Sequence, residues 1–151
     1  MKTRQSFLVL LLLLGVGAPA WAGPAEEFAD FARQRGESIA NRQLEPYLAT
    51  FADNAVLTSA LSPFRIEGKQ AIKAYFTGLF ETYPTIRVVS RQPAVRFFND
   101  GSVAVANQYS VITFVDRHGV VANRPIRSSM TAVKQGGDWL VVDQHNSLIP
   151  H

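Results

Sequence analysis

Apolar residues recur at helical spacing in the amino-terminal half of the chain. Across Ala25–Leu44 they return every three or four positions with charged residues between them, which predicts an amphipathic helix. A second, shorter helix is expected after Pro46, because proline suits the first turn of a helix, and it is expected to end at Asp53-Asn54. A third helix is predicted from about Lys69, with one apolar stripe against a sheet. The stripe comprises Ile72, Tyr75, Phe76 and Leu79.

The chain after Pro84 has the residue pattern of an antiparallel meander. Segments rich in β-branched and aromatic residues alternate with glycine-containing turns, and the expected strands are 85–91, 94–98, 103–115, 124–134 and 139–148. A short hairpin of 55–59 with 64–66 is expected before the third helix. The strand from Val103 is largely apolar or uncharged on both faces, which is typical of a strand covered on both sides. Because helices can cover only one face of this sheet, we expect a second subunit to close the other.

The amino-terminal residues have the pattern of a secretory signal peptide. Lys2 and Arg4 precede an apolar run at 7–16, and Ala20-Trp21-Ala22 is the small-x-small pattern that signal peptidase cleaves. The run is shorter than the ~20 residues needed to span a bilayer, so a retained membrane anchor is the weaker alternative. We therefore expect residues 1–22 to be removed and residues 23–151 to form one domain. The mature protein is expected to be periplasmic or secreted, without a membrane attachment.

Composition narrows the possible chemistry and partners. The chain contains no cysteine, so its core rather than disulfides must stabilise it, and lipid attachment through cysteine is excluded. Two of the fifteen basic residues lie in the signal segment, which leaves thirteen against twelve acidic residues. No basic run interleaved with aromatic residues remains, which argues against a nucleic-acid partner. No serine elbow, phosphate-binding glycine loop or dinucleotide fingerprint is present, and we expect neither a metal nor a cofactor.

The order of elements and two motifs resemble a known fold family. Helix, helix, short hairpin, helix and long meander is similar to the cone-shaped α+β fold of the nuclear transport factor 2-like or SnoaL-like superfamily. The segment Gly68–Phe76 resembles the G-x-x-A-I-x-x-Y-F start of the third helix in that fold. The segment from Arg127 through Trp139 to Pro150 resembles the A-R-(F/Y)-(S/T)-F … G-x-W-x-I-V-D-H-H-S-S-x-M-P close of one bacterial subfamily. Those proteins are similar to the association domain of calcium/calmodulin-dependent kinase II.

The resemblance carries expectations about fold, assembly and site residues. It implies three amino-terminal helices packed on a strongly curved, mostly antiparallel sheet, and a homodimer or a higher homo-oligomer. Arg127 matches the arginine of the subfamily, and His145 matches the second histidine of its closing pair. Asp143 and Ser147 are also retained. The fold hosts isomerases, dehydratases, hydrolases, binding proteins and oligomerisation modules, so it does not by itself imply a reaction.

Three positions depart from the pattern of the subfamily. Gln144 replaces the first histidine, Asn146 replaces the first serine, and Ile126 stands where alanine is preferred. These departures leave the site polar but weaken any mechanism that needs two histidines. They also weaken a zinc site, which usually needs three or four close ligands.

Strand alternation suggests where the polar residues of the last two strands meet. A period of two places Asp143, His145 and Ser147 on the same face of the last strand as Trp139, and it places Arg127 on one face of the strand before it. If these faces coincide, Arg127 and His145 meet in a cavity beneath the helices.

Arg127 is the main reason to predict a ligand site. Its guanidinium is a planar, permanently charged fork that matches a carboxylate. The predicted ligand-binding residues are Arg127, His145, Tyr109, Asn107 and Ser147. The alternative is that Arg127 pairs with Asp143 or another carboxylate and satisfies a polar core. His145, oriented by Asp143, is also a candidate general base, because histidine titrates near neutral pH.

Three functions remain open at this point. The first is an exported protein that binds a small molecule in a polar pocket suited to a carboxylate or another anion. The second is an isomerase- or hydratase-like enzyme that acts in the same cavity. The third is a homo-oligomeric association module in which the pocket is vestigial.

Overall fold

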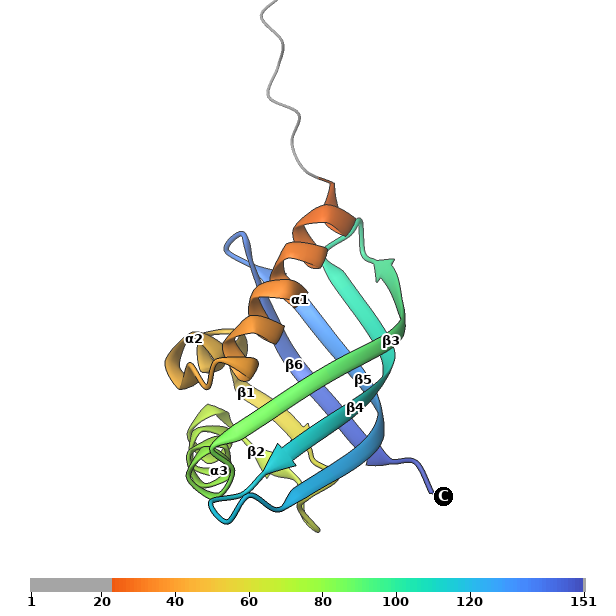
Figure 1. Cartoon of the computed structure of the whole chain (residues 1–151). Coiled ribbons are helices and arrows are strands. Elements are labelled where there is room, and N and C mark those ends of the chain that lie inside the picture. The colour runs from red at the N-terminus through yellow and green to blue at the C-terminus, as the bar shows by residue number, and fades with distance from the viewer. Residues whose placement is uncertain (1–22, 151) are drawn as a thin grey trace, which may run out of the picture.

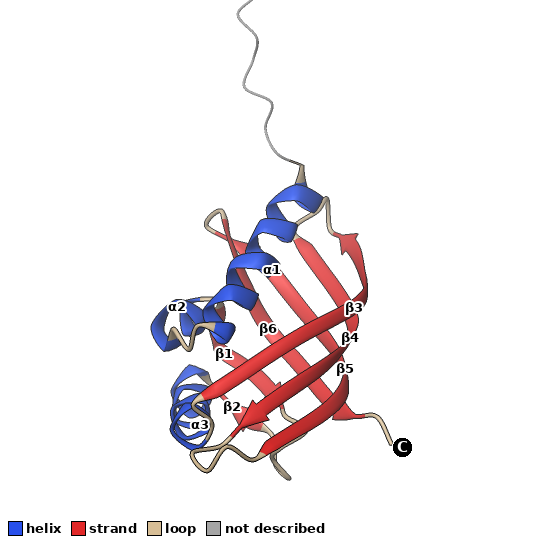
Figure 2. Cartoon of the chain, in the orientation of Figure 1, coloured by secondary structure: helices blue, strands red, loops and turns tan. Residues whose placement is uncertain are grey.

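The computed structural model describes residues 23–150 of the chain. The expected signal peptide, residues 1–22, and His151 lie outside the described residues. Figure 1 shows the course of the chain, and Figure 2 shows its helices and strands by colour. The elements are α1 (Pro24–Ala40), α2 (Leu44–Ala49), β1 (Phe51–Thr58), β2 (Ile66–Glu67), α3 (Lys69–Thr82), β3 (Thr85–Phe98), β4 (Val103–Val115), β5 (Val121–Gln135) and β6 (Asp138–Leu148).

Helix α1 forms where the sequence predicts it, and its two ends have local causes. Pro24 occupies the first turn, where its missing N–H costs no hydrogen bond. The helix ends at Ala40 rather than at Leu44, because Arg42 adopts a positive φ of 57° that a right-handed helix does not allow. The side chain of Arg42 then donates a hydrogen bond of 2.5 Å to the carbonyl oxygen of Phe80, which connects the end of α1 to α3.

The second helix is shorter than predicted, and the first strand is longer. Helix α2 ends at Ala49 and β1 begins at Phe51, so the prediction of helix as far as Asp53-Asn54 was wrong. Phe51 pairs with Val141 of β6, and both side chains are completely buried. Burial of the Phe51 ring in the core favours the strand over a continued helix, because tertiary packing overrides weak local propensity.

The six strands form one sheet in the order β2-β1-β6-β5-β4-β3. All neighbouring strands are antiparallel except β1 and β6, which are parallel. The sheet is curved, and the three helices lie on one side of it (Figure 1). We call the side covered by the helices the inner face; on β4 it carries Ala104, Gln108, Ser110 and Phe114, while the outer face carries Val105, Tyr109 and Val111. The predicted α+β fold, with helices packed on a curved and mostly antiparallel sheet, is confirmed.

Two β-bulges change the face to which side chains point. Strand β3 runs as one strand where two were predicted, with a bulge at Gln92-Pro93. In β6, Val141 and Asp143 pair with adjacent residues of β5, so Val142 is an extra residue. A single extra residue reverses the alternation of inward and outward side chains beyond it.

The core lies between the helices and the inner face. Its largest fully buried side chains are Phe51, Leu57, Ile72 and Val141. A second cluster lies beneath the amino-terminal part of α1, where the ring of Phe28 meets the ring of Trp139 edge-on at a centroid distance of 5.2 Å. On the outer face, Tyr109 and Val111 are 49% and 43% exposed, so coverage of this face by a second subunit stays a prediction. Across residues 23–150, no helix has the length and apolar character needed to cross a lipid bilayer.

Candidate functional site

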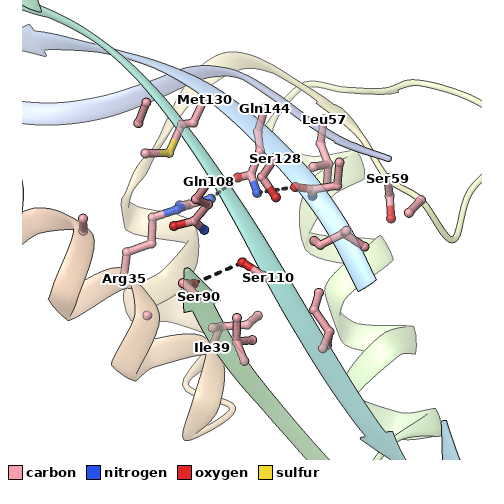
Figure 3. A pocket seen from close by; sticks show the side chains of 18 of the residues that line it. Arg35, Ile39, Leu57, Ser59, Ser90, Gln108, Ser110, Ser128, Met130 and Gln144 are labelled. Atoms are coloured by element: carbon pink, nitrogen blue, oxygen red, sulfur yellow. Dashed lines mark hydrogen bonds between the residues drawn. The ribbon is translucent and has the colours of Figure 1, made fainter. Parts of the chain in front are cut away.

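A cavity of about 280 Å³ lies between the helices and the inner face of the sheet. Helices α1 and α3 supply one wall, and strands β3 to β6 form the floor (Figure 3). Val88, Ser90 and Val95 of β3 face the cavity and are nevertheless exposed, so the cavity opens along this edge of the sheet. A concave and mostly apolar site with a few polar groups is typical of small-molecule binding.

The buried charged group of the lining is Arg35, which comes from the carboxyl-terminal half of α1. It is 6% exposed, and its guanidinium stacks on the rings of Tyr47 and Phe51 at 4.3 and 4.2 Å from their centroids. It donates hydrogen bonds to the hydroxyl of Tyr47 at 3.0 Å, to Oε1 of Gln144 at 2.5 Å, and to Oγ1 of Thr50. All of these partners are neutral.

Arg35 has no carboxylate partner within residues 23–150, where every ion pair joins other side chains. Burial lowers the pKa of the guanidinium, and the neighbouring Tyr47 partly offsets this effect. Arginine keeps its proton even so, because its ordinary pKa is far above neutral. A full positive charge therefore lies at the edge of the cavity, held by neutral dipoles and by aromatic faces.

Two tyrosine hydroxyls also border the cavity. Burial raises the pKa of Tyr47, although the adjacent Arg35 acts in the opposite direction. Burial also raises the pKa of Tyr75, whose hydroxyl lies 2.6 Å from Oγ of Ser59. Both hydroxyls stay protonated at neutral pH, so they can donate hydrogen bonds but cannot act as bases there.

Acidic and imidazole groups are missing from the part of the lining that the structure describes. Its charged residues are Arg35 and the exposed Arg124, and no Asp, Glu or His lines the cavity. Among residues 23–150, no three His, Cys, Asp or Glu side chains come together in a way that could hold a metal ion. The described lining can therefore bind and orient a ligand, but it holds no carboxylate or imidazole for proton transfer.

The structure brings the predicted ligand residues together, but on the outer face. Arg127 pairs with Tyr109 on β4 and with Ser147 on β6, while Asn107 and His145 both pair with the same residue of β5. Of these five residues, only Asn107 borders the cavity. The expectation that Arg127 and His145 meet beneath the helices was therefore wrong. The part of these five residues in binding a ligand stays a prediction.

The bulge at Val142 explains this difference. Val141 points inward and is completely buried, but beyond the extra residue the alternation is reversed, and Asp143 and His145 are exposed. Arg127 and Asp143 do not form an ion pair among the described residues, so the alternative of a buried pair in a polar core was also wrong. The catalytic role suggested for Asp143 and His145 stays untested, and neither residue lines the cavity.

The inward positions of β6 belong to the two residues that depart from the subfamily pattern. Gln144 and Asn146 line the cavity, and Gln144 binds Arg35. The pattern of the sequence did contain a signal for Arg35. Phe28, Ala32 and Ile39 form the apolar stripe of α1, and Arg35 lies on that stripe where a core residue would be expected.

Comparison with known proteins supports this fold over the described chain. Residues 24–150 match the family model of the calcium/calmodulin dependent protein kinase II association domain. No curated protein matches the sequence. A candidate association domain of this kind from Xanthomonas campestris has a similar structure, with 22% identity, coverage of 87% of this chain and 94% of that one, and a TM-score of 0.75.

Two further solved structures share the fold. A nuclear transport factor 2-like protein of unknown function from Pseudomonas putida has 20% identity, coverage of 80% and 83% of the two chains, and a TM-score of 0.69. A candidate scytalone dehydratase from Novosphingobium aromaticivorans has 12% identity, coverage of 83% and 84%, and a TM-score of 0.76. At such low identity these likenesses concern the fold alone. The family model, in contrast, covers nearly all of the described residues, and the chain therefore belongs to the family of the calcium/calmodulin-dependent protein kinase II association domain, built on the nuclear transport factor 2-like fold.

Proposed function

We propose that the protein is exported and binds a small molecule with an anionic group, such as a carboxylate, in the cavity beneath the helices. The observation that carries the proposal is the buried guanidinium of Arg35, whose partners among the described residues are all neutral. Burying a charge without a counter-charge is costly, because its hydration is lost and nothing of opposite sign replaces it. An anionic ligand supplies that counter-charge.

The partners of Arg35 leave room for a ligand oxygen. Two of them, Tyr47 and Thr50, belong to the packed end of α2, but Gln144 lies on the cavity floor. Its Oε1 accepts a hydrogen bond from Arg35, and because Gln144 borders the cavity, a ligand carboxylate can take the place of this oxygen. Hydrogen bonds between a guanidinium and a carboxylate are roughly twice as strong as bonds between neutral groups.

The main alternative is an enzyme that acts in the same cavity. The structural likeness to a candidate scytalone dehydratase is a reason to consider it. Isomerases and hydratases of the kind expected from the sequence need a general acid or base at the substrate. The described lining offers only tyrosine hydroxyls whose pKa is raised by burial, and no Asp, Glu or His. These observations favour binding over acid–base catalysis in this cavity.

Thermal unfolding with a panel of small carboxylic acids and their uncharged amides tests the proposal. We expect some acids to raise the melting temperature of residues 23–151 and the matching amides to have no effect. Arg35→Met should abolish the stabilisation by acids. Arg127→Met is the matched control, because Arg127 is an exposed arginine on the outer face and does not line the cavity.

The outcomes separate the two arginine sites. Loss of acid binding in Arg35→Met with retention in Arg127→Met supports the cavity. The reverse result would transfer the site to the outer-face residues predicted from the sequence. A panel in which no acid stabilises the protein would refute the proposal.

A specific observation favours a second function, self-association through the outer face. Val and Arg are the commonest outward residues of β3 to β5, Tyr109 lies among them, and no Lys or Glu is found at the outward positions of these strands that the structure describes. Tyrosine and arginine are enriched in protein interfaces, whereas lysine and glutamate are depleted. We propose a second copy of this chain as the occupant, which fits the association-domain family.

Sedimentation velocity of the mature protein tests self-association. We expect a dimer or a larger species at micromolar concentration, and Val111→Asp should shift it to a monomer by placing a charge in the centre of the face. Val120→Asp is the control, because Val120 is 62% exposed in a turn outside the paired part of the sheet. A monomer in the unsubstituted protein would contradict this second function.

A further inference from the structure

Six neutral polar side chains cross the floor of the cavity. On the inner face of the sheet, cross-strand pairing places Ser90 beside Ser110 and places Gln108, Ser128 and Asn146 in one row over β4, β5 and β6. Gln144 lies next to Asn146 on the same face of β6. Figure 3 shows Gln108, Ser110, Ser128 and Gln144 directed toward the same space as Arg35. The inner face of a packed sheet is ordinarily apolar, so this polar row needs an explanation.

The middle of the row has unused hydrogen-bonding capacity. Ser90 and Ser110 bond to each other at 3.1 Å, and Gln144 bonds to Arg35. The amide of Gln108 and the hydroxyl of Ser128 have no side-chain partner among residues 23–150, although both are half-buried and are direct neighbours across β4 and β5. Each of these side chains can donate and accept. Groups of this kind on a cavity floor favour a ligand that replaces the water they would otherwise bind.

The opposite wall of the cavity is largely apolar, apart from Arg35 of α1 and the hydroxyl of Tyr75 on α3. Ala32 and Ile39 of α1 and Phe76 and Leu79 of α3 face the floor from the helix side. A ligand between the two walls therefore meets a row of hydrogen-bonding groups on the sheet side and mainly hydrocarbon on the helix side. A molecule with polar substituents along one edge and an apolar opposite face satisfies both walls at once.

The row has a direction that runs from the mouth of the cavity to the buried charge. It starts at the exposed Ser90 on the edge strand β3 and ends on β6 at Gln144, which contacts Arg35. Three strand spacings of about 4.8 Å separate β3 from β6, so the row spans roughly 14 Å. An anionic group at Arg35 thus lies at the inner end, and the remainder of the ligand extends along the row toward β3.

From this arrangement we infer the chemical class of the ligand: a hydroxyl- or oxo-substituted carboxylate, whose substituents bond to Gln108 and Ser128 and whose apolar face lies against α1 and α3. The inference rests on the proposed function of the cavity. It adds that an acid without such substituents binds less well, because it displaces water from Gln108 and Ser128 without replacing the hydrogen bonds. Sites built to bond a hydroxyl discriminate strongly against analogues that lack it.

Isothermal titration calorimetry with matched pairs of acids tests the inference. Each acid is paired with its hydroxylated analogue, cinnamate with caffeate and benzoate with gallate. We expect the hydroxylated member of a pair to bind about tenfold more tightly, since each added hydrogen bond contributes modestly to the free energy of binding. In the double variant Gln108→Met/Ser128→Ala this preference should disappear, while binding of the unsubstituted acid is retained.

Controls distinguish failure of this inference from failure of the proposed function. Ser129→Ala changes the adjacent serine, which points to the outer face, and should leave the preference intact. Equal binding of both members of every pair, with loss of both in Arg35→Met, would overturn the inference while the proposed function stands. Absence of binding by every acid would overturn both. A preference for hydroxylated acids that persists in the double variant would show that other groups bind the hydroxyls. That result would also overturn the inference that Gln108 and Ser128 bind them.

Discussion

Replacing Arg35 with methionine tests whether the buried charge serves a ligand or the fold. Arg35 is 6% exposed, and the groups to which it donates are neutral, so the substitution leaves no carboxylate without its partner. Removing one member of a buried ion pair typically costs about 3–5 kcal/mol, because the remaining charge stays buried and unpaired. Arg35→Met strands no such charge, so this cost does not contribute to its effect on stability.

Two opposing effects decide the magnitude. The hydroxyl of Tyr47 loses a hydrogen bond, and a buried polar group left unpaired costs about 1–3 kcal/mol. Removal of the guanidinium relieves a desolvation penalty of several kcal/mol for a buried ion. Methionine keeps an apolar stem against the rings of Tyr47 and Phe51, which limits the loss of packing. We therefore expect the free energy of unfolding to stay within about 2 kcal/mol of the unsubstituted value.

Urea denaturation measures this free energy directly, and Arg35→Ala is the companion variant. Because alanine leaves a void, the Arg35→Ala variant should be less stable than Arg35→Met. The expected difference is about 2–5 kcal/mol, the usual cost of a large-to-small substitution in a core. An acid at about 100 times its dissociation constant should add about 2.7 kcal/mol to the unsubstituted protein and nothing to Arg35→Met. A loss of about 3–5 kcal/mol in Arg35→Met would refute the reasoning, because it would show that Arg35 stabilises the fold as strongly as a member of a buried ion pair.

Three further predictions concern the turns and the outer face. Gly101→Ala should destabilise the protein by about 1–3 kcal/mol in urea denaturation, because Gly101 has a φ of 83° and a Cβ there would lie 2.6 Å from Cγ of Pro24. Gly36→Ala is the contrasting substitution in α1, where an added Cβ meets nothing within 4 Å. It should stabilise the protein by about 0.5–1 kcal/mol. Hydrogen bonds from the backbone N–H groups of Val120 and His118 hold the pKa of Asp116 below its usual 3.8, so the stability it contributes is present above that value and is lost as the pH falls through the lower pKa of the folded state. The difference in unfolding free energy between the unsubstituted protein and Asp116→Asn should accordingly shrink as the pH falls from about 6 to about 2, and a constant difference would contradict this account. Arg127→Ala should change the free energy of unfolding of the monomer by less than about 1 kcal/mol, because Arg127 is exposed and has no ion pair among the described residues. The measurement is made below the concentration at which subunits associate. A larger loss of stability there would contradict the surface position of Arg127.

Local sequence determined most of the secondary structure. The periodic apolar residues of α1 and α3, the break at Pro84 and the glycine-containing turns between strands β3 to β6 all lie close to where the sequence predicts them. These features depend on side chains within one or two turns of each other, or on backbone angles that only a few residues adopt. The closing motif and the start of the third helix were sufficient to indicate the family as well.

Tertiary packing decided where β1 begins and what Arg35 does. Phe51 follows a helix and could extend it, but its place beside Val141 of β6 requires a strand. Arg35 is one of two arginines in α1, and only its position opposite Gln144, far away in the sequence, makes it a buried cation in a cavity. A helical pattern shows that a charged residue lies on the apolar stripe, but it does not show which groups surround that residue.

The sequence also could not predict which residues of the last strand point into the cavity. Strict alternation placed His145 on the face of Trp139 and Val141, whereas the extra residue Val142 in the pairing with β5 reverses this order and directs Gln144 and Asn146 into the cavity. A bulge depends on how two curved strands pair, and no residue type in β6 predicts its position. The sequence by itself therefore determined the fold and the cluster of polar residues near the end of the last strand. Only the pairing of β5 with β6 decided which polar residues meet Arg35, because one residue of register is sufficient to exchange the two faces of a sheet.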